Sequence, residues 1–473
     1  MGRHSKGRHR RVRRHRLWLS KGLWAVSDQA LFALTNFAVT VLLARWLSLS
    51  DYGAFAVAFS VLLLMGTVHT ALLTEPMLVL GPSRYQERTA AYVRRLVTLH
   101  FALTAVMGLA LLLVVGALTL LLPQFTAAIT LVALALSAPA ILFLWLVRRA
   151  CYIESRPRLA AAASLLYALI VPAGMLLLTQ IGMLPAASGL LSLGLSSLFV
   201  GSWLTFRLSR SGAEPTTTIP RPHVTRAHWA YGRWALGFGA LSWVPPNAVV
   251  MALPLWHSLE DAGTLRVATT LMLPVLHVHG ALGPLLMPAL VRARLSAQLR
   301  STAKLAGVLF VALSMIYAPV VLIFGSQLAE LLFGPKYSIT GATLWLLAAI
   351  PLVTAVSAVS GAVLRALERL GRVLWTYVAA TVMTLLVGLP LVFAYGVNGA
   401  LASMLLGALT TAILGTHASW RLTSAPRRPD RRRTRRWPGE PASAGTRALS
   451  SAPFVDSSDG TSDGSRDGAH ARP

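Results

Sequence analysis

The sequence contains few charged residues. Only 12% of its 473 residues are Asp, Glu, Lys or Arg, whereas 55% are hydrophobic. Soluble domains carry about 25% charged residues, so this composition excludes an ordinary soluble protein. Apolar runs of about 20 residues, the length of a membrane-crossing helix, recur along the chain. Because the alternating pattern of membrane β-strands is missing, we expect an all-α polytopic membrane protein.

Cysteine and catalytic motifs are also scarce. The single cysteine, Cys151, excludes a disulfide framework and is expected to be a packing residue. The sequence has no Walker-type phosphate loop, no G-x-S-x-G, no H-E-x-x-H and no group of metal ligands at a recognisable spacing. We therefore expect a transporter rather than an enzyme, without a metal or cofactor. Lacking an ATPase, it would use an ion gradient, the membrane potential or downhill flow of its substrate.

Acidic residues are the rarer charged type, with 16 Asp and Glu against 43 Lys and Arg, which gives a net charge of +27. In a soluble protein this excess would suggest nucleic acid. Here the basic residues gather in the two ends and in alternate loops, as the positive-inside rule requires. The intervening loops contain one basic residue, Lys336; these loops are 46–52, 122–126, 180–184, 256–262, 325–340 and 395–396.

This alternation predicts about twelve spans in the cytoplasmic membrane, with both termini in the cytoplasm. It predicts no nucleic acid partner, and anionic membrane lipid at the basic tails. The expected domains are a disordered basic arm (1–21), a six-helix half (22–206), a cytoplasmic linker (207–232), a second six-helix half (233–416) and a disordered tail (417–473). The expected spans are 22–45, 53–74, 96–121, 127–147, 158–179, 185–206, 233–255, 263–290, 303–324, 341–363, 372–394 and 397–416.

A short internal repeat supports this division. Residues 46–58 and 256–268 share Trp, Ser, Leu, Asp, Gly, Val and Ala at a constant offset of 210 positions. Each copy lies at the turn between the first and second helix of its half, on the same side of the membrane. The repeat therefore predicts two parallel halves, related by an axis along the membrane normal.

The repeated residues suggest a structural role for the turn. Asp51 and Asp261 are expected to cap the helix that follows, because a carboxylate accepts bonds from free N–H groups at a helix start. Gly53 and Gly263 are expected to permit close approach of helices or backbone. Direct substrate contact is the alternative for all four residues.

The repeat and two further segments resemble the polysaccharide flippase family, which contains the O-antigen and exopolysaccharide translocases of the multidrug/oligosaccharidyl-lipid/polysaccharide exporter superfamily. Residues 44–53 read Ala-Arg-Trp-Leu-Ser-Leu-Ser-Asp-Tyr-Gly, 332–337 read Leu-Phe-Gly-Pro-Lys-Tyr, and 231–233 read Tyr-Gly-Arg. The resemblance covers residues 18–420. It implies translocation of a polyprenyl-diphosphate-linked oligosaccharide by alternating access.

Polar residues inside the expected spans are candidate site residues, since charge is costly within a bilayer. Asp28 and Asn36 lie on a polar stripe of the first helix and are candidates for the substrate site, and Asp28 also for ion coupling. Arg266 interrupts the repeat and could pair with a diphosphate. Arg45 is a further substrate candidate. The alternatives are a hydrogen-bonded helix end for Asp28 and snorkelling to the interface for both arginines.

Two expected spans of the second half contain unusual residues. His277 and His279 are candidates for proton coupling, although packing or a hydrogen bond is the simpler explanation, and their spacing does not suit a metal site on a helix. Prolines are expected to break both spans near a cavity; they are Pro245, Pro246, Pro274 and Pro284.

The sequence leaves three functions open. The first is the lipid-linked oligosaccharide flippase, with polysaccharide polymerase or glycosyltransferases as possible partners. The second is a related transporter of lipid II or of cationic drugs; few intramembrane carboxylates and only twelve spans speak against these two substrates. The third is a membrane scaffold that recruits glycosyltransferases through its basic tails.

Overall fold

The computed structural model describes residues 3–122, 126–182, 185–210, 219–337, 339 and 341–424. Every regular element in this part of the chain is helical, which confirms the all-α prediction. The helices are α1 (Arg3–Trp46), α2 (Leu49–His69), η1 (Thr70–Thr74), α3 (Glu75–Arg84), η2 (Gln86–Arg88), α4 (Thr89–Leu121), α5 (Ala128–Ile153), α6 (Pro157–Gln180), α7 (Ala186–Ser209), α8 (Arg221–Trp256), α9 (Leu259–Leu271), α10 (Leu273–Leu295), α11 (Leu299–Phe333), α12 (Ala342–Ala366), α13 (Leu370–Met383), η3 (Thr384–Gly388) and α14 (Leu389–Ser424).

The described helices are suited to crossing a membrane. Ten are long and apolar enough, and α9 with α10 forms an eleventh, bent span. The stretch from Leu370 to Ser424 has 55 residues, about 80 Å of helix at 1.5 Å per residue, far more than one crossing needs. It folds back at Gly396, where φ is 55° and ψ is −127°. The described chain therefore makes twelve crossings.

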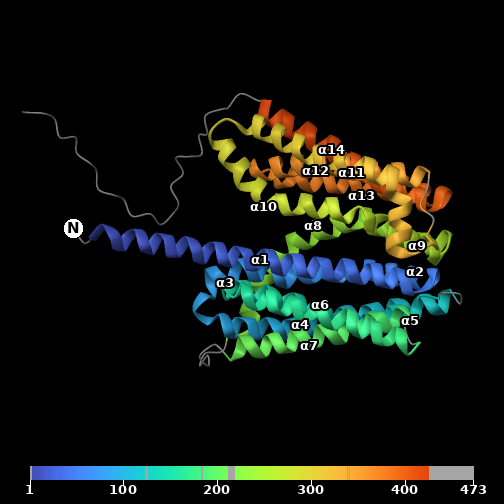
Figure 1. Ribbon diagram of the computed structural model, residues 1–473, viewed down its shortest axis with the longest axis horizontal. Helices are drawn as coiled ribbons and strands as arrows, with labels where there is room; N and C mark the ends of the chain where they lie inside the picture. Colours follow the sequence, from blue (N-terminus) through green and yellow to red (C-terminus); the bar gives the residue numbers. More distant parts are fainter. Residues whose placement is uncertain are drawn as a thin grey trace, which may run out of the picture. The chain divides into compact units, whose positions relative to one another are not determined.

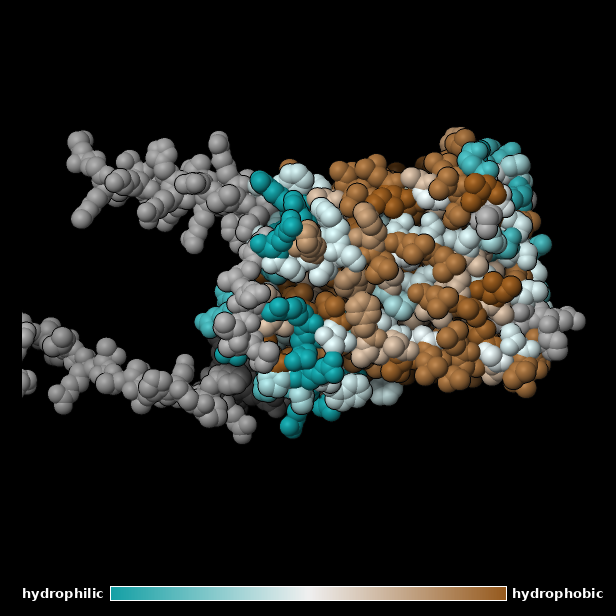
Figure 2. Space-filling view, turned by 90° about the horizontal axis from the view of Figure 1, so that it is seen from below, coloured by the Kyte–Doolittle hydropathy of each residue, from teal (hydrophilic) through white to brown (hydrophobic). Residues whose placement is uncertain are grey.

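The two halves repeat one packing plan. In the first half, α5 packs on α4 and α7, and α6 packs on α1 and α7. The second half repeats this pattern, because α12 packs on α11 and α14, and α13 packs on α8 and α14. Figure 1 shows the helices of each half gathered on their own side, and Figure 2 shows a broad apolar band between two more polar ends.

For orientation we name the two ends of the bundle by their turns. The low-charge end contains turns 47–48, 257–258 and 334–337. The basic end contains turns 85–88, 154–156, 296–298 and 367–369. Most Lys and Arg residues of the loops belong to the basic end.

Helix boundaries differ from the sequence prediction in three places. α1 begins at Arg3, so helix occupies the segment expected to be a disordered arm; Lys and Arg favour helix, and extending an existing helix is easy. α8 begins at Arg221, well before the expected residue 233, with Pro222 in its first turn. α14 continues to Ser424, and the remaining tail, 425–473, lies outside the described residues.

The repeat turns are capped by serine, not by aspartate as expected. The hydroxyl of Ser48 accepts a bond from the backbone N–H of Asp51 at 3.0 Å, and that of Ser258 does the same for Asp261 at 3.1 Å. Each serine also donates to the aspartate that it caps, at 2.7 and 3.0 Å. Because each N-cap serine lies three residues before its aspartate, the carboxylate lies inside the first turn of the helix, where it still faces the positive end of the helix dipole.

The repeat glycines hold the two halves together, as expected from their lack of a side chain. α2 and α9 cross at Gly53 and Gly263. A Cβ on Gly53 would lie 1.7 Å from the carbonyl oxygen of Leu259, and one on Gly263 would lie 3.1 Å from the backbone nitrogen of Gly53. Only glycine permits this approach of two backbones.

The proline predictions are only partly correct. α9 and α10 meet at a bend of 52° beside Pro274. α8 is continuous through Pro245 and Pro246, because the carbonyl of Leu241, which Pro245 leaves without a donor, accepts the Thr381 hydroxyl at 3.1 Å. α10 likewise continues through Pro284, whose side chain is outside the described part of the structure.

Replacing Gly53 with alanine should lower the unfolding temperature of the purified protein by several degrees. Overpacking typically costs about 1–3 kcal/mol, and here the new methyl would overlap backbone that cannot rotate away. Thermal unfolding in detergent, followed by tryptophan fluorescence, measures the effect. Gly116→Ala is the control, because its Cβ would meet no atom within 4 Å. Equal unfolding temperatures for the two variants would contradict the close contact.

Candidate functional site

The low-charge end is closed by contacts between the halves. The turn after α11 lies against the end of α1: the Lys336 amine donates to the carbonyls of Arg45, at 3.2 Å, and Leu47, and the Tyr337 hydroxyl donates to the carbonyl of Ala44 at 3.3 Å. Arg45 donates in return to the carbonyl of Leu331 on α11 at 3.1 Å. Arg45, a substrate candidate from the sequence, therefore belongs to this closure.

At the basic end, the start of α8 packs on the first half. His228 Nδ1 lies 2.9 Å from the carbonyl of Leu72 in the π-helical turn η1, and His228 Nε2 lies 2.7 Å from the Tyr92 hydroxyl of α4. A Cβ on Gly232 would lie 2.6 Å from the carbonyl of Ala71 in the same turn. The first helix of the second half is thus held by the first half. No sequence pattern indicates His228, since its partners are a backbone carbonyl in a π-turn and a tyrosine 136 positions away in the chain.

The other central helix of the second half takes a different path. Below its 52° bend, α10 packs mainly on α11 and α12 of its own half. His279 bonds to the carbonyl of Phe310, and Arg294 bonds to the carbonyl of Ala366 and to Glu368, all in the second half. Toward the basic end, α8 therefore stays with the first half and α10 with the second.

Asp28 lies at the centre of a buried polar cluster that joins three helices of the first half. It is 0% exposed, and its Oδ1 accepts Arg148 Nη2 at 2.9 Å and Arg148 Nε at 3.1 Å. Ser164 donates to Oδ1 and Tyr152 to Oδ2, each at 2.5 Å. Gln29 adds a bond to Oδ2 at 3.2 Å. The carboxylate is fully hydrogen-bonded.

Arg148 is a buried cation that the sequence pattern does not indicate, because it falls directly after the expected span 127–147. It lies within α5, 5% exposed, with its guanidinium 3.7 Å from the centre of the Phe32 ring. Its neighbour Arg149 is exposed. Two adjacent arginines at a helix end look alike in sequence, and only the need of Asp28 for a partner could have distinguished them.

Arg266 lies where the halves meet. From α9, its guanidinium lies 4.3 Å from the centre of the Phe59 ring of α2. Its Nε atom is buried without a hydrogen-bond partner, and so is the hydroxyl of Tyr52 on α2. Among the described residues, no carboxylate forms an ion pair with Arg266. The interface therefore contains a cation whose charge is not neutralised by the described protein.

The remaining candidates are bonded within their own halves. Asn36 donates to the carbonyl of Phe32 on its own helix at 2.9 Å. The exposed His277 has its Nδ1 2.6 Å from the carbonyl of Leu273. His279 is buried, with Nε2 3.1 Å from the carbonyl of Phe310 on α11. The two histidines diverge, as their spacing predicted, and the coupling roles of Asp28, His277 and His279 stay predictions.

A buried histidine pair, His69 and His100, lies inside the first half. His69 Nε2 is 3.0 Å from His100 Nδ1, and His100 Nε2 is 3.0 Å from the carbonyl of Pro139. Because a carbonyl only accepts, His100 donates through Nε2, and His69 then donates to His100. No group of three or more metal-ligating residues occurs in the described part of the chain.

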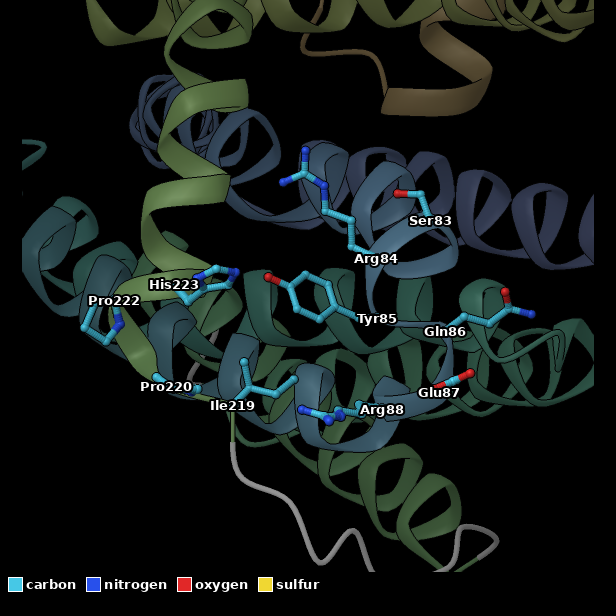
Figure 3. Close-up of a pocket in the computed structure, with 10 residues that line it drawn as sticks. All are labelled: Ser83, Arg84, Tyr85, Gln86, Glu87, Arg88, Ile219, Pro220, Pro222 and His223. Atoms are coloured by element: carbon cyan, nitrogen blue, oxygen red, sulfur yellow. The ribbon is translucent and has the colours of Figure 1, made fainter. Parts of the chain in front are cut away.

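A pocket of about 830 Å³ opens at the basic end, between η2 and the start of α8. Figure 3 shows Tyr85 pointing toward His223 within it, with Arg84 and Arg88 on the same wall. Tyr85 stacks on Tyr92 at 4.2 Å between ring centres. Neither Arg266 nor Asp28 lines this pocket, so it is separate from the site residues that the sequence predicts.

Comparisons with known proteins identify the fold. No family model and no curated protein matches the chain. Among solved structures, an inward-facing multidrug resistance MATE family transporter of the MOP superfamily matches with a TM-score of 0.66 and 12% identity, over 85% of this chain and 98% of that one. An outward-facing MATE transporter matches at 0.56 and 13%, over 85% and 94%. A MOP superfamily transporter from Pyrococcus furiosus matches at 0.55 and 15%, over the same shares. These similarities establish a MATE-type transporter fold with twelve spans.

Asp28→Asn should destabilise the protein by about 3–5 kcal/mol, because it leaves the Arg148 guanidinium buried without a counter-charge. The unfolding temperature in detergent measures the loss. Adding Arg148→Gln should recover part of it. The control is Glu368→Gln, which breaks an exposed pair with Arg294 and should cost less than about 1 kcal/mol. If Asp28→Asn were as mild as Glu368→Gln, the cluster would not be a structural element.

Proposed function

We propose that the protein is an alternating-access transporter. One observation carries this proposal: the contacts that close the low-charge end, from Lys336, Tyr337 and Arg45, go to backbone carbonyls of the opposite half. These contacts can break without disrupting the hydrogen bonds within either half. The same fold in inward- and outward-facing neighbours supports the proposal.

The basic end is proposed to face the cytoplasm, with both termini on that side, because the loops at this end carry the Lys and Arg residues. The closed low-charge end would then face outward and the described state would be inward-facing. The higher TM-score to the inward-facing neighbour, 0.66 against 0.56, supports this assignment.

Reporter fusions at residues 424 and 396 test the orientation. A fluorescent protein that folds only in the cytoplasm should be bright after Ser424 and dark after Gly396, whereas a periplasmic phosphatase should give the reverse result. The same signal from both positions would contradict a crossing between them.

The proposed substrate is an anionic lipid-linked oligosaccharide. Arg266 is the supporting observation, since a half-buried cation with a buried, unpartnered Nε and no carboxylate partner among the described residues favours a ligand that brings negative charge. A diphosphate fits this role, because its oxygens can accept two guanidinium bonds at once. The resemblance of segments 44–53 and 332–337 to polysaccharide flippases points to the same substrate class.

A multidrug exporter is the second candidate. The matching solved structures favour it, as several are named multidrug transporters. A cationic drug would need a free carboxylate in the interior, and the buried carboxylate of Asp28 is already bonded to Arg148. In the Pyrococcus furiosus transporter, a reversed polarity of the binding pocket suggests a different function, which supports charge as the property that separates the two candidates.

Arg266→Gln should reduce transport of a fluorescent polyprenyl-diphosphate oligosaccharide in proteoliposomes about 10- to 100-fold, the loss expected for one or two charge-assisted hydrogen bonds. Arg233→Gln, which removes an exposed cation of α8, is the control and should transport normally. Uptake of a cationic dye with no oligosaccharide transport would favour the multidrug candidate. Unchanged oligosaccharide transport would remove Arg266 from the site.

Protein partners are the least constrained part of the proposal. A scaffold that recruits polymerase or glycosyltransferases would use the basic tails, and residues 425–473 lie outside the described part of the structure. Deleting residues 1–16 and 424–473 separates the roles, because a transporter should still move its substrate in vesicles, whereas a scaffold should lose polymer export in cells.

A further inference from the structure

A groove of about 700 Å³ runs along the outside of the second half, between α11 and α14 and over α12. Its lining residues recur every three or four positions on each helix, so each helix contributes a single face. Both α11 and α14 pack against α12 but hardly against each other. Within the described parts of α11 and α14, the side-chain hydrogen bonds between the two helices come from Arg300, which donates to Thr423 at 3.4 Å and to Ser424.

Small residues keep this groove open. A Cβ on Gly307 of α11 would meet no atom within 4 Å, whereas one on Gly415 of α14 would lie 2.6 Å from the Ser360 hydroxyl of α12. α14 therefore lies close to the floor, and α11 leaves space beside it. In the first half, the pair of helices equivalent to α11 and α12 is joined by aromatic packing, as Phe101 of α4 lies 5.5 Å from Phe143 of α5 between ring centres.

The groove has one charged end. Arg300 and Lys304 line it at the basic end, both exposed, and the rest of the lining is mostly apolar with a few hydroxyls. Lys304 makes no hydrogen bond or ion pair with the described residues. No Asp or Glu lines the groove. Two cations thus face it without a counter-charge from its walls.

The length of the groove matches one leaflet of a bilayer. Its lining on α11 extends from Arg300 to Met315, about 22 Å along the helix at 1.5 Å per residue. Half of a hydrocarbon core is about 15 Å, which leaves the cations at headgroup depth. Trp420, 65% exposed on α14, lines the groove at this level, where aromatic side chains favour the membrane interface.

We propose that this groove binds a membrane phospholipid with an anionic headgroup, from the leaflet at the basic end. The phosphate would lie between Arg300 and Lys304, because a guanidinium fork and an ammonium both suit phosphate oxygens. An acyl chain would lie over Gly307 toward Met315. A free anion would leave the apolar part empty. The site is separate from Arg266, so its occupant is a bound lipid and not the transported molecule.

Native mass spectrometry of the full-length protein tests the proposal, with phosphatidylglycerol and phosphatidylcholine as probes at equal concentration. The wild type should retain phosphatidylglycerol preferentially. The double variant Arg300→Gln/Lys304→Gln should lose about 30-fold in apparent affinity for phosphatidylglycerol, the effect of two basic residues at an anionic headgroup. The matched control, Arg369→Gln/Arg372→Gln, removes two exposed cations from the same end outside the groove and should bind as the wild type does.

Gly307→Leu is a second, independent test, because the leucine side chain fills the apolar part of the groove and leaves Arg300 and Lys304 in place. It should reduce retention of phosphatidylglycerol at an unchanged unfolding temperature. Three results would overturn the proposal: equal loss in the Arg369→Gln/Arg372→Gln control, full competition by soluble glycerol phosphate, or retention of polyprenyl phosphate in place of phosphatidylglycerol. The last result would make the groove a path for the substrate.

Discussion

The contact between the backbones of α2 and α9 is the constraint on which the rest of the structure depends. Gly53 and the carbonyl of Leu259 approach so closely that no side chain fits between them. Because the contact lies at the start of both helices, it joins the halves at the low-charge end and leaves their other ends free to diverge. Ser48 and Ser258 cap the two helices in the same way, so the crossing is nearly symmetric.

The similarity between the two halves ends between this crossing and the basic end. α8 remains on the first half through His228 and Gly232, whereas α10 turns away beside Pro274. At the basic end, α8 therefore packs on the first half, whereas α10 packs on the second half. If the protein changes between inward- and outward-facing states, we expect the largest local changes at the bend beside Met272 and at the contact of His228 with the first half.

The sequence predicted the fold well, because membrane insertion leaves strong signals. Apolar runs and loop charge predicted the twelve crossings. The short repeat, which recurs at an offset of 210 positions, predicted the two halves and the close contact at the glycines. Local hydrogen bonds were harder. The cap at Ser48 depends on where the helix begins, and the unbroken path of α8 depends on Thr381, far away in the chain, bonding the carbonyl that Pro245 frees. The partner of Asp28 was hidden for the same reason, as Arg148 resembled a loop residue.

Arg148 and Arg266 show why burial alone does not identify a site. Both guanidinium groups lie over a phenylalanine ring, at 3.7 and 4.3 Å. Arg148 has a carboxylate held by two hydroxyls, so its charge is balanced inside the protein. Arg266 has no carboxylate partner among the described residues and lies where α9 of the second half meets α2 of the first half. An internal ion pair fixes a structure, whereas an unbalanced charge at a movable interface favours the binding of an oppositely charged molecule. This difference in charge balance, and not the fold shared with drug exporters, is the physical reason for which we propose an anionic substrate.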